Sequence, residues 1–283
     1  MIESVATPLK EQVKAFWEAN PCDVKEAEPA LDTAYFTAFA QQRYRTHPYI
    51  PYFADFEAAA SQRVLEVGVG VGTDFCRWAA AGAQAVGVDL TAQAVQLTTR
   101  HLRALNLSAD VSLADCENLP FADHSFDVVY SFGVLHHTPN TERAIREVLR
   151  VLKPGGRIRI MLYHKRSWVT LKVYLLHGLL ALQPFASIDR LLANHMESQG
   201  TKAYTVSEVE AMFAAFEDVA VEPILTCYDT WRGYEASRRS GLLTLARRLW
   251  PAWLVRQCGD RFGWNLLISV TKPDASAPRN AHA

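Results

Sequence analysis

The sequence has neither an excess of charge of one sign nor a long apolar run. Its 283 residues carry 29 Lys and Arg against 30 Asp and Glu, for a formal net charge of −1. Overall charge therefore does not favour nucleic acid or an acidic membrane as a partner. The longest apolar segment, residues 173–186, is interrupted by His177 and Pro184 and is shorter than the roughly 20 residues that span a bilayer. We expect neither nucleic-acid binding nor stable membrane insertion.

Cysteine is scarce and shows no paired spacing. The five cysteines include no CxxC pair and have no partners at the spacing of a zinc site. We therefore expect free thiols, as in a reducing compartment, and no metal site. The first residues lack a basic leader followed by an apolar stretch, the pattern of a signal peptide. A cytoplasmic protein is expected.

The chain does contain an alternation of short β-branched runs with amphipathic helices. Strands are expected at residues 64–67, 85–88, 111–114, 126–131 and 157–162, with helices near 74–81, 92–105 and 141–152. Thr91 is the expected N-cap of the second of these helices. Such alternation is typical of a parallel sheet covered by helices. The sequence predicts an α/β, Rossmann-like, doubly wound fold with a core over residues 61–165.

Four further segments flank this core. Residues 1–60 are helix-prone and rich in aromatic side chains, and they predict an N-terminal helical cap. Residues 166–205 predict a helical insertion that forms either a lid or an oligomer face, such as that of a homodimer. Residues 206–273 predict helices at 207–216 and 241–255 and strands at 219–228 and 265–271, which complete a mostly parallel seven-stranded sheet. Residues 274–283 are polar and are expected to be disordered.

A glycine-rich turn follows the first expected strand. Gly68, Gly70 and Gly72 lie there, and Asp89 ends the second strand 21 residues after Gly68. Glycines allow a ligand to approach the backbone closely, and an acidic residue at this spacing binds ribose hydroxyls. The dinucleotide fingerprint requires a third glycine where this chain has Thr73. An NAD-dependent reductase is therefore disfavoured.

Together with later motifs, this turn resembles the class I S-adenosylmethionine-dependent methyltransferases, in their ubiquinone/menaquinone-biosynthesis-like (methyltransferase type 11) branch. The family's first motif, E-x-G-x-G-x-G, matches residues 66–72. Further matches lie at residues 89–91, 114–121, 125–129, 135–137 and 152–157. The resemblance covers residues 60–165 and the two terminal strands, and it implies an enzyme that uses S-adenosyl-L-methionine and yields S-adenosyl-L-homocysteine.

The resemblance also implies roles for individual residues. Glu66 would face the cofactor's ammonium group, Asp89 would bind the ribose, and Asp115 would accept a hydrogen bond from the adenine amino group. The other implied cofactor residues are Gly68, Gly70 and Gly72 around the methionine part, Leu90 and the Cys116 backbone N–H at the adenine, and Ser131 and Phe132 at the sulfonium.

Methyl transfer from a sulfonium requires mainly alignment and exclusion of water. A general base is needed only where the accepting atom arrives protonated. The candidate catalytic residues follow the fourth and fifth strands: His136, His137, Tyr163 and His164. An imidazole has a suitable pKa of about 6.5. The alternative for at least one of the histidines is a hydrogen bond that only holds the loop.

The acceptor is predicted to be a small molecule. A specialised metabolite is favoured over a lipid quinone because the N-terminal segment and the insertion would enclose a compact acceptor. Arg43, Arg45 or His47 could bind a carboxylate on it, and the alternative is that these arginines are solvated. A different class of function, a non-catalytic module that binds S-adenosylmethionine, stays open.

Overall fold

The computed structural model describes residues 3–21, 31–216, 218–230 and 250–274. Its strands form a seven-stranded sheet in the order β3-β2-β1-β4-β5-β7-β6. The strands are β1 (Arg63–Val67), β2 (Gln84–Asp89), β3 (Asp110–Leu113), β4 (Phe126–Phe132), β5 (Leu152–Tyr163), β6 (Asp218–Ile224) and β7 (Asn265–Thr271). The first five are parallel, and β7 is antiparallel to both β5 and β6. The predicted doubly wound α/β fold is confirmed.

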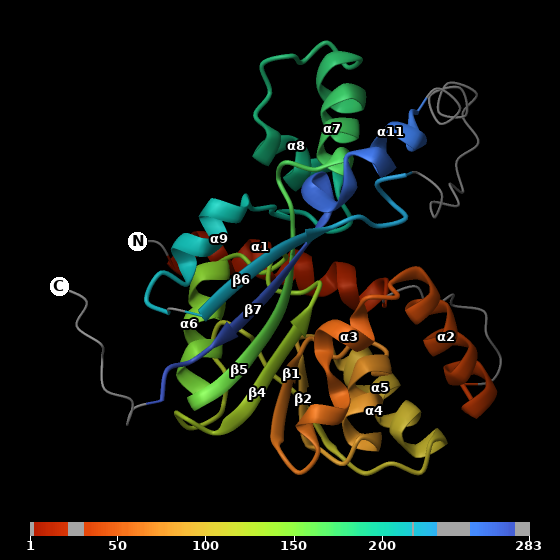
Figure 1. Cartoon of the computed structure of the whole chain (residues 1–283), viewed down its shortest axis with the longest axis vertical. Helices are drawn as coiled ribbons and strands as arrows, with labels where there is room; N and C mark the ends of the chain where they lie inside the picture. Colours follow the sequence, from red (N-terminus) through yellow and green to blue (C-terminus); the bar gives the residue numbers. More distant parts are fainter. Residues whose placement is uncertain (1–2, 22–30, 217, 231–249, 275–283) are drawn as a thin grey trace.

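Helices cover both faces of this sheet (Figure 1). The helices are α1 (Glu3–Ala19), α2 (Thr33–Thr46), α3 (Ile50–Ala54), α4 (Thr73–Ala80), α5 (Ala92–Ala104), α6 (Thr141–Val151), α7 (Trp168–Val173), α8 (Ile188–His195), α9 (Val206–Met212) and α11 (Ala252–Gln257). The Thr91 side chain accepts from the Ala94 N–H at 3.3 Å, so the predicted N-cap of α5 is confirmed.

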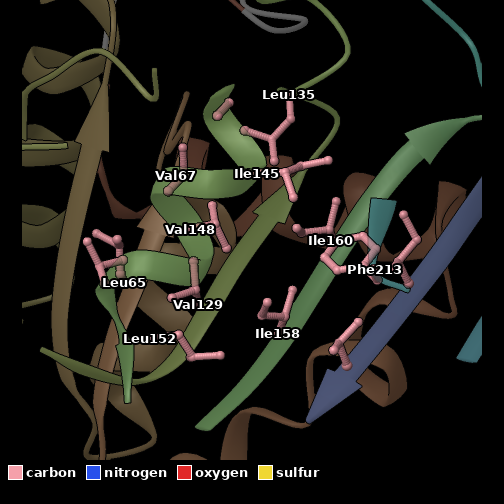
Figure 2. Packing of buried hydrophobic residues seen from close by; sticks show 14 of the residues in the cluster. Leu65, Val67, Val129, Leu135, Ile145, Val148, Leu152, Ile158, Ile160 and Phe213 are labelled. Atoms are coloured by element: carbon pink, nitrogen blue, oxygen red, sulfur yellow. The ribbon is translucent and has the colours of Figure 1, made fainter. Parts of the chain in front are cut away.

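Alternate residues along each strand supply two separate cores, because successive side chains of a strand point to opposite faces. Leu65, Val67 and Val129 pack with α6 and the segment around α9 on one face, as Figure 2 shows. Val64 and Tyr130 pack with α3, α4 and α5 on the other. The central strands are therefore apolar on both sides, as a covered parallel sheet requires.

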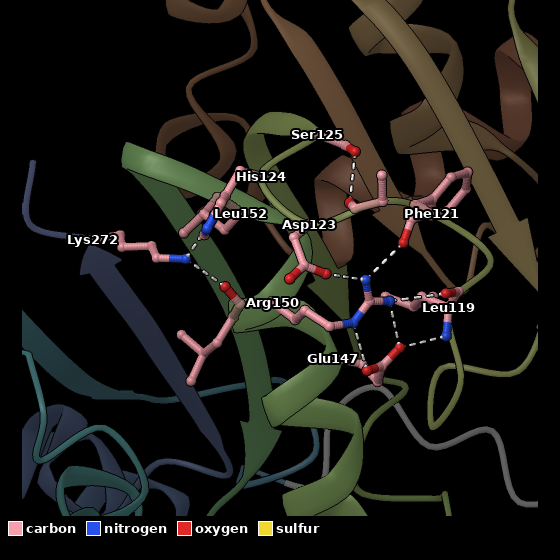
Figure 3. A network of polar contacts seen from close by, with 11 residues as sticks. Leu119, Phe121, Asp123, His124, Ser125, Glu147, Arg150, Leu152 and Lys272 are labelled. Atoms are coloured by element: carbon pink, nitrogen blue, oxygen red, sulfur yellow. Dashed lines mark hydrogen bonds and ion pairs between the residues drawn. The ribbon is translucent and has the colours of Figure 1, made fainter. Parts of the chain in front are cut away.

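The loop that follows β3 is fastened to α6 (Figure 3). The Glu147 carboxylate accepts from the Leu119 N–H at 2.8 Å, and the Arg150 guanidinium donates to the carbonyls of Leu119 and Phe121 at 3.0 and 2.7 Å. Arg150 and Glu147 also pair with each other at 2.8 Å. These contacts fix a loop whose first residues, 114–116, belong to the candidate site described below.

The C-terminal segment differs from the prediction in where its elements end. The strand expected at 219–228 ends at Ile224, because the next N–H groups bond to side chains: Leu225 to Asp260 at 2.7 Å and Thr226 to Asp229 at 2.8 Å. The helix expected at 241–255 lies mostly outside the described residues, as does the expected tail after Asp274. Within the described ranges, no helix is both long enough and apolar enough to span a bilayer.

Candidate active site

A cavity of about 760 Å³ opens at the carboxyl ends of β1, β2 and β4. The strand order reverses between β1 and β4 at this edge, which is where open α/β sheets bind ligands. The N-terminal segment closes the cavity with Val13 and Trp17 of α1 and with Phe39 and Arg43 of α2. No residue of the insertion at 166–205 lines it, so the insertion is not the lid of this cavity.

The structure brings most of the predicted site residues together. The cavity is lined by Glu66, Gly68, Gly70, Asp89, Leu90, Asp115, Cys116, Phe132 and His137. Five predicted residues do not line it, namely Gly72, Ser131, His136, Tyr163 and His164. Most of the residues that line the cavity come from the ends of β1, β2, β3 and β4 and from the loops that follow them. Strands that are far apart in the chain therefore converge on one cavity.

Two glycines of the turn have different tasks. Gly68 has φ +84°, and a Cβ there would lie 2.2 Å from a methyl carbon of Val134, which also lines the cavity. Gly72 has φ +79°, and its Cβ would lie 2.8 Å from Thr98 on α5. Gly72 therefore permits close packing of the turn against α5, and its predicted place beside the cofactor is corrected.

Gly68→Ala tests this close approach by its effect on the free energy of unfolding. Gly82→Ala is the matched control, because Gly82 has φ +85° but no other atom within 4 Å of its would-be Cβ. Both variants incur the cost of a left-handed backbone, about 1–2 kcal/mol. Gly68→Ala is expected to lose about 1–3 kcal/mol more through overpacking. Equal losses in urea titrations would show that Val134 makes room without cost.

Glu66 is a buried carboxylate with an unused acceptor. Its side chain is 4% exposed, it lines the cavity, and its Oε2 has no hydrogen-bond partner among the described residues. Burial, and next the nearby Asp74 carboxylate, raise the pKa of Glu66 well above its ordinary value. A buried oxygen of this kind is costly unless a donor reaches it. A cationic donor group in the cavity would supply that partner.

Asp89 holds the turn and the start of α5 together. One carboxylate oxygen accepts from the Gly70 N–H at 3.1 Å, and the other accepts from the Thr91 N–H and hydroxyl at 3.0 and 2.8 Å. A carboxylate offers about four acceptor positions, so these three bonds leave capacity for a ligand hydroxyl. The bonds that Asp89 makes to the turn and to Thr91 are therefore compatible with its predicted role in binding ribose.

The adenine side of the predicted site is tied to α1. Lys10 bonds Asp115 at 2.6 Å and Glu117 at 2.8 Å. Glu117 also accepts from the Thr138 hydroxyl and from the Asn140 N–H. Sequence reasoning missed Lys10 and Glu117, because Lys10 precedes Asp115 by 105 residues and no local pattern links them.

Arg43 on α2 forms a buried pair with Asp74 on α4. The Nε donates to Asp74 at 3.0 Å, a second guanidinium nitrogen pairs with the same carboxylate, and the hydroxyls of Tyr130 and Tyr44 donate to it at 2.8 and 3.1 Å. Asp74 is 2% exposed. The expectation that the arginines are solvated is wrong for Arg43, while Arg45 is exposed. Two of the three guanidinium nitrogens of Arg43 are therefore used by Asp74.

The two histidines after β4 have different surroundings. The His137 Nδ1 lies 2.8 Å from the Ser198 hydroxyl, and burial, with Lys202 next, lowers the pKa of His137 to about 3. His136 is fully buried, and neither of its ring nitrogens has a partner within the described part of the chain. Burial lowers the pKa of His136 well below its usual value. Neither imidazole is a strong base near neutral pH.

The other three predicted residues, Ser131, Tyr163 and His164, do not line the cavity. The centroid of the Tyr163 ring lies 3.8 Å from that of His136, with the rings tilted by 34°, and 4.2 Å from that of Trp264, on which it stacks. The His164 Nδ1 lies 2.9 Å from the Gly263 carbonyl, and the Ser131 hydroxyl donates to the Val67 carbonyl at 3.0 Å. The insertion and β7 cover the end of β5, so its residues pack against them. The prediction that Tyr163 and His164 are catalytic residues, and that Ser131 lies at the sulfonium end, is therefore corrected.

Comparisons with known proteins fit this arrangement. Residues 65–160 match a family model described as a methyltransferase domain. The methyltransferase GfsG of Streptomyces halstedii is 36% identical over 108 residues, 37% of this chain and 38% of that protein. The demethylmenaquinone methyltransferase of Clavibacter sepedonicus is 40% identical over 102 residues, 36% of this chain and 41% of that protein. The chain thus spans about two fifths of these relatives.

The structural likeness extends further along the chain than the sequence likeness. The solved structure of the 4+2 cyclase SpnF superposes with a TM-score of 0.53 at 20% identity and covers 96% of this chain and 94% of that one. This likeness shows a shared fold over most of the chain, whereas the two relatives above match little more than a third of it.

Proposed function

We propose that the protein transfers the methyl group of S-adenosylmethionine to a small molecule, because residues 65–160 match the methyltransferase-domain family model. The accepting atom is an oxygen, nitrogen, sulfur or carbon. The observation that carries the proposal is the convergence of Glu66, Gly68, Asp89 and Asp115 on one cavity at the strand ends.

The cavity's own chemistry fits the cofactor. The unpartnered Oε2 of Glu66 suits an ammonium group, and the backbone at Gly68 lies where a side chain would meet Val134. Asp89 retains capacity for a ribose hydroxyl, and Asp115 with Cys116 lies at the adenine side. When bound, S-adenosylmethionine supplies a methyl group activated by a positive sulfur. The residues around it need to orient the acceptor and keep water out.

The remaining lining belongs to the acceptor. Phe39, Thr46, His47, Phe132 and Tyr228 line the cavity beside Arg43, and this mixture of aromatic and polar groups is typical of a small-molecule pocket. The cofactor takes part of the 760 Å³, so the space left favours a compact acceptor over a long lipid quinone. With His137 at a pKa of about 3, an acceptor that arrives without a proton on its reacting atom suits the pocket best.

The first test is the affinity for S-adenosylhomocysteine, measured by calorimetry. Asp89→Ala is expected to weaken binding by about 1.5–3 kcal/mol, the range for hydrogen bonds to a charged group. The control is Asp127→Ala, because Asp127 also accepts a backbone N–H, from Arg63 at 2.9 Å, but lies at the opposite edge of the sheet. Unchanged affinity in Asp89→Ala would refute the ribose contact.

A second measurement separates the enzyme from a non-catalytic module. The low basicity of His136 and His137 would hinder only an acceptor whose reacting atom carries a proton, so turnover itself has to be measured. Formation of S-adenosylhomocysteine from S-adenosylmethionine is followed with a panel of small hydroxyl, thiol, amine and carboxylate compounds. Turnover with any of them supports the enzyme, and tight cofactor binding without turnover supports the module.

A further inference from the structure

A chain of two hydrogen bonds leads from the sheet to the acceptor side of the cavity. Asn265, the first residue of β7, is 2% exposed, and its Nδ2 donates to the Tyr49 hydroxyl at 2.7 Å. The same hydroxyl lies 2.9 Å from the Nδ1 of His47. His47 follows α2 directly and lines the cavity, whereas Tyr49 and Asn265 do not.

Counting protons along this chain fixes the direction of both bonds. An amide nitrogen only donates, so the Tyr49 oxygen accepts from Asn265. The phenol has one proton, and His47 is its only other partner in the described ranges. The phenol therefore donates to Nδ1, because otherwise its proton would be buried without an acceptor. An Nδ1 that accepts has no proton, so the neutral ring carries its proton on Nε2.

The ionisation of both rings agrees with this direction. Burial raises the pKa of Tyr49, so the phenol keeps its proton. Burial, and then the charge of Arg43, lower the pKa of His47 to about 4, while Asp74 acts in the opposite sense. His47 is therefore a neutral imidazole near neutral pH.

The Nε2 is the polar atom that His47 offers to the cavity. It lies on the far side of the ring from Nδ1, and no described residue bonds to it. The rings of Phe132 and Tyr228, which also line the cavity, lie 6.1 and 6.3 Å from the His47 ring. Other polar side chains also line this side: Arg43 is paired with Asp74, and the Gln42 amide donates to the Thr46 hydroxyl at 3.2 Å.

We propose that Asn265 and Tyr49 hold His47 as its Nε2–H tautomer, so that His47 is a hydrogen-bond donor toward the cavity. This donor selects a methyl acceptor that carries a lone pair on oxygen. This rests on the proposed function. A carbonyl, an ether, a carboxylate or a phenolate satisfies such a donor, whereas an ammonium group does not. Tyr49 and Asn265 are positioning residues, and His47 is the residue that touches the acceptor.

The tautomer can be measured on the protein alone. With nitrogen-15-labelled histidine, a two-bond proton–nitrogen correlation spectrum distinguishes the protonated from the bare ring nitrogen. The His47 signals among the nine histidines are identified by their loss in His47→Gln. The expected result is a proton on Nε2 of His47 in the wild type. A proton on Nδ1 would overturn the proposal.

Two variants test the origin of the tautomer. In Asn265→Asp the new carboxylate accepts a hydrogen bond from the Tyr49 hydroxyl. The phenol oxygen must then accept a hydrogen bond from His47, and the spectrum should show the proton on Nδ1. In Tyr49→Phe the ring should exchange between tautomers. Tyr52→Phe is the matched control, since Tyr52 is 89% exposed, and it should keep Nε2–H. If both variants keep the proton on Nε2, the hydrogen bonds of Asn265 and Tyr49 do not set the tautomer. If Asn265→Asp does not fold, the comparison of Tyr49→Phe with the wild type tests the proposal.

Selection by His47 has its own measurement. His47→Phe is expected to lower kcat/KM at least tenfold for an oxygen-bearing acceptor that the wild type methylates, while S-adenosylhomocysteine affinity stays within twofold. Equal loss for amine and oxygen acceptors would contradict selection. Absence of any turnover or of S-adenosylhomocysteine binding in the wild type would instead refute the proposed function, and the spectra would still report the tautomer.

Discussion

Arg43→Met is expected to lower the free energy of unfolding by about 3–5 kcal/mol, the cost of leaving one partner of a buried ion pair without the other. Asp74 is 2% exposed and also accepts from Tyr44 and Tyr130, but neutral donors do not compensate its charge. Because α2 and α4 are joined by this pair, the loss should be visible in urea titrations as an earlier midpoint. Arg45→Met, two residues along the same helix and exposed, should change stability little.

The pH dependence provides a second signature of the same pair. Burial alone would raise the pKa of Asp74, but the charge and hydrogen bonds of Arg43 outweigh it and lower that pKa. In the wild type this contribution is therefore present above the unfolded pKa of about 3.9 and is lost as pH falls through the lower folded pKa. Without Arg43 burial prevails and the folded pKa of Asp74 lies above the unfolded one. The deficit is therefore largest above that raised pKa and shrinks as pH falls from it toward the lower wild-type pKa. A deficit that does not change with pH would point to lost packing.

The parts of the fold that the sequence predicted are those that short stretches determine. Apolar runs such as residues 126–131 are buried on both faces of the sheet, and the N-cap at Thr91 depends only on residues within one helical turn. The glycine turn was equally readable, because φ values near +80° at Gly68 and Gly72 exclude most other residues. Spacing could not show that Gly72 faces α5 rather than the cavity.

The parts that were missed depend on partners far apart in the sequence. Arg43 meets Asp74 across 31 residues and Tyr49 meets Asn265 across 216, and a single sequence carries no signal for either contact. The placement of Tyr163 failed for a related reason. The carboxyl end of β5 was expected at the ligand edge, but the insertion and Trp264 cover it. The N-terminal segment lines the cavity instead, with Phe39, Arg43 and His47.

The proposed contact at Glu66 leads to the second large effect, a proton released when S-adenosylhomocysteine binds. Burial, and then Asp74, raise the pKa of Glu66 in the ligand-free protein, which favours the protonated acid. The ligand's ammonium group favours the carboxylate, so binding should expel up to one proton and affinity should increase with pH until the free acid is ionised. Calorimetry in two buffers of different ionisation enthalpy at one pH measures this proton. Glu66→Gln should abolish the release and weaken binding by about 2–5 kcal/mol, the cost of truncating a buried charged pair.

Adenosine is the matched ligand for this experiment, because it keeps the base and ribose but has no ammonium group. Its binding should depend on Asp89 and Asp115 but release no proton, and Glu66→Gln should leave its affinity almost unchanged. If adenosine also expelled a proton, the titrating group would be another carboxylate of the cavity, for which Asp89, with its pKa raised by burial, is the candidate. If neither ligand expelled one and Glu66→Gln left the affinity for S-adenosylhomocysteine unchanged, Glu66 would not be the partner of the ammonium group.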